Sequence, residues 1–361
     1  MSRVWDIPVQ DSTRVRDVRV AIEDACAQTG LDPHATAVAA LVATELATNL
    51  VKHADAGRIV INFTGPADTL AHAVPCVQIT SLDHGPGIGD VRAAMQDGYT
   101  TAPSSLGAGL GTCLRISSAF DLHTCSGRGT VAVARVSSAR PRVASHSRLL
   151  PSPTGTRAGG INASLGRAEH SGDAFTWVRS GSQVTLMLAD GLGHGDKAAV
   201  ASTAAMDGLC RAAALPPAEI LRHLHAALRP TRGAAIAVAQ LDERVNRLLF
   251  AGVGNVGARL RNTAGWQHLV SQPGIVGAQF PATVPVQHLA WQPDSMLILH
   301  SGGLPSHWTP PHDQQLLTHD PAVVAAVVLR DAGSAARPLR DDTSVAVLTP
   351  TRPTGVHDRD F

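Results

Sequence analysis

The stretch "ELATNLVKH", residues 45–53, carries polar side chains at every fourth position. Glu45, Asn49 and His53 rotate by only about 40° per step around a helix, so they share one side of it. Apolar residues repeat at the same spacing on a neighbouring stripe, namely Val38, Val42, Leu46 and Leu50. The pattern predicts a helix over 34–54 whose polar stripe is either a solvated surface or the wall of a binding site.

Composition narrows the classes of protein to which the chain can belong. Its 361 residues favour two domains, and 44% hydrophobic content with a net charge of +1 argues against nucleic acid or membrane as the main partner. Lysine occurs only at 52 and 197, so the chain has no G-K-[ST] phosphate loop. Five cysteines without paired spacing predict reduced thiols in a cytoplasm, and no apolar run is expected to span a bilayer.

The first half of the chain combines helices and strands. Helices are expected over 13–29, 34–54 and 108–120, and strands over 57–63 and 74–83, followed by a hairpin around Ser126–Gly129. Beyond it the chain is rich in Ser, Pro, Arg and Gly without a period, which predicts a linker.

The second half is dominated by short apolar strands. They are expected at 174–178, 183–190, 234–241, 246–253, 258–262, 296–301 and 344–349, with helices near 195–214, 217–229 and 321–332. This order predicts packed antiparallel sheets with flanking helices.

Two later segments give the polar stripe of the first helix a chemical meaning. "DHGPGI" (83–88) follows a strand, and "SLGAGLGT" (105–112) places glycines at the start of a helix. Glycines let a backbone approach a ligand closely, and a helix N-terminus offers N–H groups to phosphate. An Asp accepts a hydrogen bond from an amine such as that of adenine, and an Asn suits a hydrated Mg²⁺. Together they predict a nucleotide site without a P-loop.

These motifs resemble those of the GHKL ATPase superfamily, and within it the RsbT/RsbW-like switch kinases. "TELATNLVKHA" is similar to their N-box, "DHGPGI" to their first glycine box, and "SLGAGLGTCLRISSAFDLHTCSGRGTVAVA" to their second glycine box and terminal G-T. The resemblance covers about residues 10–136. It implies an ATP-binding α/β sandwich, the Bergerat fold, that transfers phosphate to a Ser or Thr of a STAS-domain antagonist protein.

The resemblance assigns roles to single residues. Glu45 is expected to be the catalytic base, Asn49 to hold Mg²⁺, and Asp83 to bind the adenine amine. The residues expected to admit the nucleotide are Gly85, Gly87, Gly107, Gly109 and Gly111, with Thr130 near the base. His53 has two open interpretations, a structural residue or a phosphate contact. The chain has no separate histidine-bearing dimerisation helix, so an autophosphorylating histidine kinase is not expected.

A second group of acidic residues lies in the C-terminal half. Asp173 and Asp190 come at the ends of predicted strands, and Asp341 and Asp342 directly precede another. Each could belong to an ordinary Asp-Gly turn or loop. Converging carboxylates repel one another unless cations lie between them, and Mn²⁺ or Mg²⁺ suits such oxygen ligands. The group therefore predicts a metal site.

This half resembles the protein phosphatase 2C (PPM) superfamily in its SpoIIE/RsbX-like branch. The matching segments are "SGDAF", "LADGLGHGDKAA", "HSGGL" and "DDTSVAVL", within residues 161–350. The resemblance implies a two-sheet α/β sandwich with a binuclear Mn²⁺ or Mg²⁺ site that removes phosphate from Ser or Thr. The ligands it implies are Asp173, Asp190 and Asp341, with Gly191 contributing its carbonyl.

One position departs from that family. Where its members usually have S-D-G-L, this chain has "SGGL", with Gly302 in place of a metal-binding Asp. A replacement ligand could come from water, Asp342, His300 or His307, and the sequence does not choose among them.

The sequence thus predicts an α/β (α+β) protein with a switch-kinase domain at 1–137, a linker at 138–160, a phosphatase domain at 161–350 and a tail at 351–361. The expected function is a bifunctional regulator of stress signalling in the cytoplasm that phosphorylates and dephosphorylates STAS-domain proteins, upstream of a regulator or sigma-factor system. The alternative is an ATP-binding partner-switching protein whose phosphatase half is a weak or non-catalytic scaffold.

Overall fold

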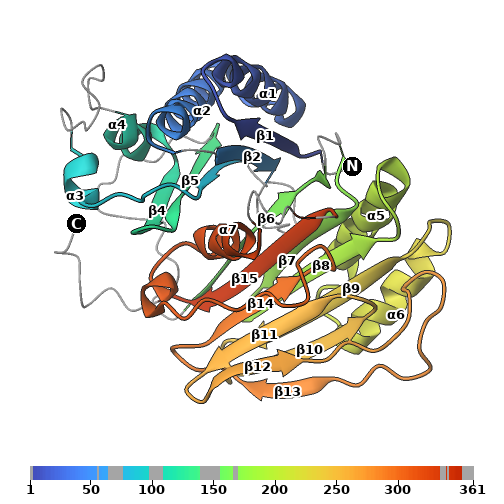
Figure 1. The fold of residues 1–361 in the computed structure, drawn as a ribbon. Coiled ribbons are helices and arrows are strands. Elements are labelled where there is room, and N and C mark those ends of the chain that lie inside the picture. The colour runs from blue at the N-terminus through green and yellow to red at the C-terminus, as the bar shows by residue number, and fades with distance from the viewer. Residues whose placement is uncertain are drawn as a thin grey trace. The chain divides into compact units, whose positions relative to one another are not determined.

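The computed structural model describes residues 3–54, 57–63, 76–96, 109–138, 155–165, 170–333, 339 and 341–351. The chain forms two compact units (Figure 1). One holds strands β1–β5 with helices α1–α4, and the other holds β6–β15 with α5–α7. Two units agree with the two domains expected from the length of the chain. The proposed tail, apart from residue 351, lies outside the described residues.

The N-terminal unit is an α/β sandwich built on one antiparallel sheet with the strand order β1-β2-β3-β5-β4. Apolar residues of α1, α2 and the sheet form one buried core, with Ile22, Leu46 and Ile79 fully enclosed. The predicted fold class is confirmed here. The elements are β1 (Trp5–Val9), α1 (Thr13–Thr29), α2 (Pro33–His53), β2 (Gly57–Phe63), β3 (Cys76–Asp83), α3 (Val91–Ala94), α4 (Gly109–Ile116), β4 (Ala119–Cys125) and β5 (Gly129–Ser137).

The long helices begin and end at residues suited to those positions. Helix α1 spans the predicted range and ends at Gly30, which adopts the left-handed conformation with φ 68°. Helix α2 begins after Asp32, whose side chain accepts the N–H of Ala35 at 2.8 Å, and Pro33 takes the first position. Both predicted helices are confirmed to within one residue.

The helix predicted over 108–120 is wrong at its C-terminal end. Helix α4 ends at Ile116, and Ala119 and Phe120 already belong to β4, where they pair with Arg135 and Ala134 of β5. The apolar residues of this segment fit either period, and pairing with β5 decides the outcome. The predicted hairpin between β4 and β5 is confirmed.

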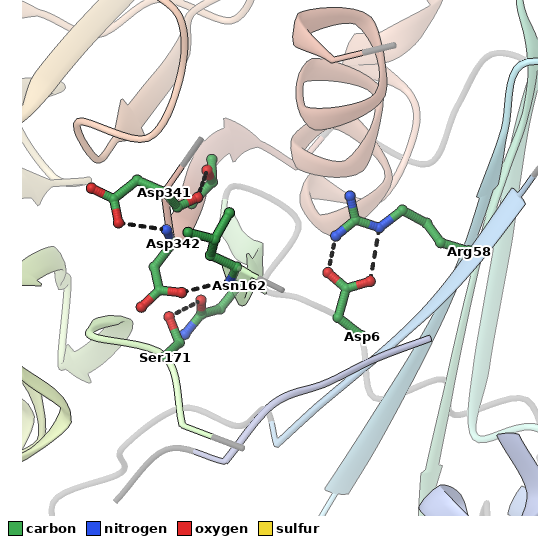
Figure 2. A network of polar contacts seen from close by, with 8 residues as sticks. Asp6, Arg58, Asn162, Ser171, Asp341 and Asp342 are labelled. Carbon is green, nitrogen blue, oxygen red and sulfur yellow. Dashed lines mark hydrogen bonds and ion pairs between the residues drawn. The ribbon is translucent and has the colours of Figure 1, made fainter. Parts of the chain in front are cut away.

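Strand β1 was not predicted. Its five residues contain a proline, so no regular alternation stands out in the sequence. The strand pairs antiparallel with β2 at the edge of the sheet, where a proline is tolerated. Asp6 of β1 forms a two-bond ion pair with the guanidinium of Arg58 on β2 (Figure 2). This planar pairing adds a side-chain bond to the strand ladder.

Helix α2 corrects the expectation that no apolar segment could cross a bilayer. Its 21 residues are long and apolar enough by length and composition, as a single candidate among the described residues. In the structure, however, its apolar stripe packs into the core of the N-terminal unit, with Val42, Leu46 and Leu50 buried. Packing on the sheet therefore accounts for the apolar composition of this helix.

The C-terminal unit contains two five-stranded antiparallel sheets, in the orders β13-β10-β9-β8-β7 and β12-β11-β14-β15-β6. Helices α5 and α6 cover one sheet, and α7 packs on β6 and β15 of the other. The elements are β6 (Thr156–Ala163), β7 (Asp173–Ser180), β8 (Gln183–Gly191), α5 (Asp196–Ala212), α6 (Pro217–Leu228), β9 (Ala234–Asp242), β10 (Arg247–Val253), β11 (Gly257–Asn262), β12 (Gly265–Leu269), β13 (Gln287–Ala290), β14 (Met296–His300), α7 (Pro321–Ala332) and β15 (Thr343–Pro350).

Strand β8 shows how the sequence specifies this packing. Leu186 and Leu188 face the core between the two sheets, whereas Met187 and Ala189 face α5 and α6. Both faces of the strand are therefore buried, and the sequence appears as one continuous apolar run. The predicted two-sheet sandwich is confirmed.

The predicted linker at 138–160 is wrong at its C-terminal end. Strand β6 begins at Thr156 and pairs with β15, so residues 156–160 belong to the sheet. The pair Gly159–Gly160 favours a loop in the sequence, but the fold needs a small residue here. A Cβ at Gly160 would lie 2.5 Å from the carbonyl oxygen of Val345 and 2.8 Å from the ring of Phe175.

We expect Gly160→Ala to lower the free energy of unfolding of the C-terminal unit by about 1–3 kcal/mol, because the added methyl overlaps backbone that cannot move aside. Urea denaturation would measure the change. Gly333→Ala is the matched control, since a Cβ there meets its nearest atom at 3.5 Å. Equal stability of the two variants would contradict the steric argument.

Candidate functional site

A cavity of about 380 Å³ lies in the N-terminal unit beside the polar stripe of α2. The polar residues and glycines that line it come from α2, the end of β3, the loop after it, α4 and β5: Glu45, Asn49, Lys52, His53, Ser81, Asp83, Gly87, Gly89, Gly109 and Thr130. Apolar side chains, among them Leu50, Ile88 and Leu122, complete the wall. The polar stripe therefore faces a cavity and is not simply a solvated surface.

Two of the glycines predicted to admit the nucleotide do not lie in the wall, and a third is not described. Gly85 and Gly111 are buried and do not line the cavity, and Gly107 lies outside the described residues. Gly85 has a packing role: a Cβ there would lie 3.2 Å from both Ala54 Cα and the carbonyl oxygen of His53. This glycine allows the turn after β3 to pass close to the end of α2.

Asp83 is held rigidly at one wall of the cavity. Its side chain is 8% exposed, and its Oδ1 accepts the N–H of Gly85 at 2.7 Å and that of Thr130 at 3.2 Å. Gly129 makes this possible with φ 92°, since a Cβ there would lie 2.1 Å from the carbonyl oxygen of Asp83. An acceptor fixed in this way can select a ligand that presents an N–H donor.

We expect Asp83→Asn to weaken nucleotide binding by about 10- to 100-fold. With its oxygen still on the two backbone N–H groups, the amide would present its own N–H to an adenine amine, so donor would face donor. Titration of a fluorescent ATP analogue measures the loss. Asp90→Asn is the control, because Asp90 caps α3 outside the cavity lining and undergoes the same change of charge. Equal affinities of the two variants would contradict the role of Asp83.

Glu45 and Asn49 lie against the start of α4. A Cβ at Gly109 would come within 2.7 Å of Glu45 Oε2 and 3.8 Å of Asn49 Nδ2. The charge of Glu45 also acts on Cys113 of α4, whose thiol pKa rises to about 12, mainly through burial and further through Glu45. Glycine at 109 thus lets α4 begin directly beside both polar side chains.

The amide of Asn49 supports a ligand in this cavity. Its Nδ2 is buried and has no hydrogen-bond partner among the described residues. A buried polar atom without a partner is costly, and a bound ligand is one way to satisfy it. Turning the amide over in its plane would place Oδ1 at the same point, which suits a Mg²⁺ bound with a nucleotide. The residues therefore fit Mg²⁺ and ATP.

The C-terminal end of α2 brings a cation to the cavity that the sequence did not single out. Lys52 is the permanent cation among the described lining residues, and it is adjacent to His53. Partial burial lowers the pKa of His53, and the charge of Lys52 lowers it further, which favours the neutral ring. Lys52 is thus better placed than His53 to balance phosphate charge. Its rarity, as one of two lysines, was the available signal.

Thr124 is a second residue missed in the sequence. Its hydroxyl accepts the N–H of Ile88 at 2.8 Å and lies 3.1 Å from the hydroxyl of Thr130. Gly87 packs against the same strand, where a Cβ would lie 2.7 Å from the carbonyl oxygen of Cys125. The loop after β3 is therefore attached to the β4–β5 hairpin on one side of the cavity.

In the C-terminal unit, two predicted metal ligands face each other. Asp173 begins β7 and Asp190 lies near the end of β8, and the two are direct partners in the antiparallel register. Asp173 is 2% exposed. Gly191, which follows Asp190 at the end of β8, is required by packing, because a Cβ there would lie 2.2 Å from the carbonyl oxygen of Ala198 in α5. The register thus explains why two carboxylates separated by a hairpin meet.

The electrostatics of this pair favour a bound cation. The pKa of Asp190 is raised to about 6, mainly by burial and also by the charges of Asp341 and Asp342. The N–H of Gly302, 3.2 Å from Oδ2, acts in the opposite direction and lowers this pKa. Burial and the charge of Asp190 raise the pKa of Asp173 well above its ordinary value. A divalent cation would stabilise the ionised forms.

Asp342 is committed to backbone hydrogen bonds. Its Oδ1 accepts the N–H of Leu165 at 2.7 Å, and its Oδ2 accepts that of Gly172 at 2.6 Å. Its own N–H donates to Asp341 Oδ1 at 2.9 Å, and Ser171 donates to Asn162 beside it (Figure 2). Asp342 therefore anchors the segments that carry the acidic pair, and Asp341 lies next to it.

The described residues contain no group of three or more His, Cys, Asp or Glu side chains placed to hold one ion. The donors that fit are the facing carboxylates of Asp173 and Asp190, with the carbonyl of Gly191 nearby in the chain. Mg²⁺ commonly binds through one or two carboxylates and keeps several waters, so this donor set suits one such ion. A second ion would need a further ligand near Gly302.

His300 is a poor candidate for that ligand. Its Nε2 accepts the indole N–H of Trp308 at 3.2 Å, and its Nδ1 lies 3.0 Å from the carbonyl oxygen of Ser301, to which it donates. Burial lowers the pKa of the ring to about 4, so it is neutral. Both nitrogens have hydrogen-bond partners, which argues against His300 as the replacement for the missing Asp.

Among proteins of known sequence, the chain is similar over part of its length to the serine/threonine-protein kinase RsbT of Bacillus subtilis (strain 168). The two are 36% identical over 87 residues, which are 24% of this chain and 61% of RsbT. The chain thus spans less than two thirds of the length of this relative.

Two solved structures are similar at low sequence identity. One, from work on the bacterial stressosome, has 24% identity, covers 54% of this chain and 98% of its own, and gives a TM-score of 0.48. The other contains the PP2C phosphatase domain and part of the regulatory domain of SpoIIE from Bacillus subtilis. It has 16% identity, covers 79% of this chain and 81% of its own, and gives a TM-score of 0.47.

Family models match both parts of the chain. Residues 9–136 match the histidine kinase-like ATPase domain, and residues 180–350 match stage II sporulation protein E (SpoIIE). These ranges contain Glu45, Asn49 and Asp83 on one side and Asp190 and Asp341 on the other. The chain therefore joins a histidine kinase-like ATPase domain to a domain of the SpoIIE family.

Proposed function

We propose that this protein is a bifunctional regulator of partner switching in the cytoplasm. Its ATPase domain would phosphorylate a Ser or Thr of a STAS-domain protein, and its SpoIIE domain would remove that phosphate. The observation that carries the kinase assignment is the unpartnered amide of Asn49, buried beside Glu45 in a cavity bordered by Asp83. A downstream regulator or sigma-factor system is the expected target of the switch.

Each residue of the cavity has a role that its position supports. Asp83 would bind the amine of adenine, Asn49 would hold Mg²⁺, and Lys52 would balance phosphate charge. Glu45 would accept the proton of the acceptor hydroxyl, because it is the carboxylate of the lining that lies beside the start of α4. Bound ATP supplies the phosphate that is transferred.

In the SpoIIE domain, Asp173 and Asp190 would hold a divalent cation with the carbonyl of Gly191, and Asp341 would complete the acidic surroundings. Such an ion supplies an activated water for phosphate ester hydrolysis. The raised pKa values of both facing carboxylates support this role. They mean that the ionised forms are destabilised by burial and by neighbouring negative charge, which a bound cation would offset. Asp342 would act by holding the backbone around them.

Joining the two activities in one chain has a kinetic reason. A partner bound by one domain stays at high effective concentration near the other, so phosphorylation and its reversal act on the same molecule. The balance between them would then depend on ATP, on the metal and on the state of the partner.

A second candidate is an ATP-binding scaffold whose SpoIIE domain does not hydrolyse phosphate. The observation that favours it is Gly302, which cannot coordinate a metal, together with the lack of a three-ligand group among the described residues. Under this candidate, the ATPase domain would still bind and release partners, while the SpoIIE domain would only present a docking surface.

The test uses the purified full chain with a STAS-domain protein from the same genome. With labelled ATP and Mg²⁺, label should appear on a Ser or Thr of the partner. After removal of ATP, Mn²⁺ should release that label as phosphate. Transfer without release would favour the scaffold, and the absence of transfer to every STAS-domain protein of the genome would overturn the kinase assignment.

A further inference from the structure

The space that an aspartate would need at position 302 is already occupied. A Cβ on Gly302 would lie 2.6 Å from Nδ2 of Asn255, while the N–H of Gly302 donates to Asp190 Oδ2. One backbone residue thus contacts Asp190 on one side and the amide of Asn255 on the other. The side chain of Asn255 therefore lies where the side chain of an aspartate at position 302 would begin.

The turn that carries Asn255 is attached to the acidic pair through the sheet. It joins β10 to β11, and Gly254 within it has φ 93° and packs against Ala235, where a Cβ would meet the Ala235 Cβ at 2.4 Å. Ala235 is the partner of Asp190 in the register of β8 with β9. Asn255 is therefore positioned by the same strands that position the carboxylates.

The amide of Asn255 is available for a ligand. It is exposed at the surface and makes no hydrogen bond with any described residue. Because nothing holds it, the amide can turn over and present Oδ1 where Nδ2 now lies. Amide oxygens are ordinary ligands of hard divalent cations, although weaker than carboxylates because they carry no charge.

We propose that Asn255 takes the place of the missing aspartate and supplies a neutral oxygen ligand to a second divalent cation beside Asp190. This rests on the proposed phosphatase function. The consequence is a second site that is present but weak, so that its occupancy, and with it hydrolysis, depends on the Mn²⁺ concentration. The side chains at 255 and 302 compete for one position.

The test is Mn²⁺ binding to the purified full chain, measured by calorimetry and by electron paramagnetic resonance, neither of which needs catalysis. Asn255→Asp should strengthen the weaker Mn²⁺ site by about tenfold or more, and Asn255→Ala should weaken it by a similar factor. Asn246→Asp is the matched control. It makes the same change of charge before β10, at the opposite end of that seven-residue strand.

Gly302→Asp provides the decisive comparison. Its new side chain must displace Asn255, so Asn255→Ala should weaken Mn²⁺ binding in the natural chain and have no effect when Gly302→Asp is already present. Unchanged binding in both Asn255 variants, with hydrolysis intact, would overturn the assignment and leave the phosphatase function standing. Mn²⁺ binding that responds to Asn255 without hydrolysis would keep the assignment and refute the phosphatase function.

Discussion

Replacing Glu45 with alanine is expected to lower the rate of phosphate transfer by about 100- to 10,000-fold while leaving ATP affinity nearly unchanged. A base acts on the acceptor hydroxyl during transfer, so its loss affects chemistry more than ground-state binding. Glu45→Gln tests this more strictly. It keeps the shape that packs beside Gly109 and removes only the basic carboxylate.

Single-turnover transfer to the STAS partner separates the two effects, with ATP affinity measured in parallel. The control is Glu23→Ala, because Glu23 lies on α1 outside the cavity lining and forms an exposed ion pair with Arg19. Transfer by Glu45→Gln at the natural rate would show that Glu45 is not the base. Loss of ATP binding in both Glu45 variants would instead assign it to the nucleotide.

Asp190→Asn is expected to abolish Mn²⁺-dependent hydrolysis and also to change the stability of the metal-free chain. In the folded chain the pKa of Asp190 is about 6, whereas the ordinary pKa of an aspartate is 3.8. Folding without metal therefore favours the protonated form of Asp190. Stability from this group is therefore present at low pH and is lost as the pH rises through about 4 to 6.

Thermal unfolding of the C-terminal unit between pH 4 and 7, with and without Mn²⁺, measures this. The natural chain should lose stability as the pH rises without metal and regain it with Mn²⁺, because the ion stabilises the carboxylates. Asp190→Asn should reduce the pH dependence, leaving the part that comes from the buried Asp173, and should remove the response to Mn²⁺. Asp207→Asn, on the exposed side of α5, is the control and should behave like the natural chain. A Mn²⁺ response that survives Asp190→Asn would place the ion elsewhere.

Local patterns account for most of the fold that the sequence predicted. Helix α1 was predictable because a period of 3.6 and a glycine stop coincide, and β8 because a long apolar run ends in Asp-Gly. Strands β1 and β6 were not. Their proline and paired glycines oppose a strand locally, and only neighbours such as Arg58 and Phe175 show why they are tolerated.

The candidate sites divide in the same way. Glu45 and Asn49 could be grouped because one helix fixes their spacing, and Asp173 and Asp190 because both come at strand ends. Lys52 lies on the same helix, but a lysine near the end of a helix is usually a surface residue, so its position in the sequence did not assign it to the cavity. Asn255 could not be found, since its relation to Gly302 exists only after two sheet strands and two turns have come together.

Because Asn255 occupies the space beside Gly302, it also affects which mutations can improve metal binding first. In a genetic selection for growth at scarce manganese, a change at 302 must first expel a neighbour, whereas Asn255→Asp alters one atom in a place already shaped for it. Selected gain-of-function alleles should therefore accumulate at codon 255 before codon 302.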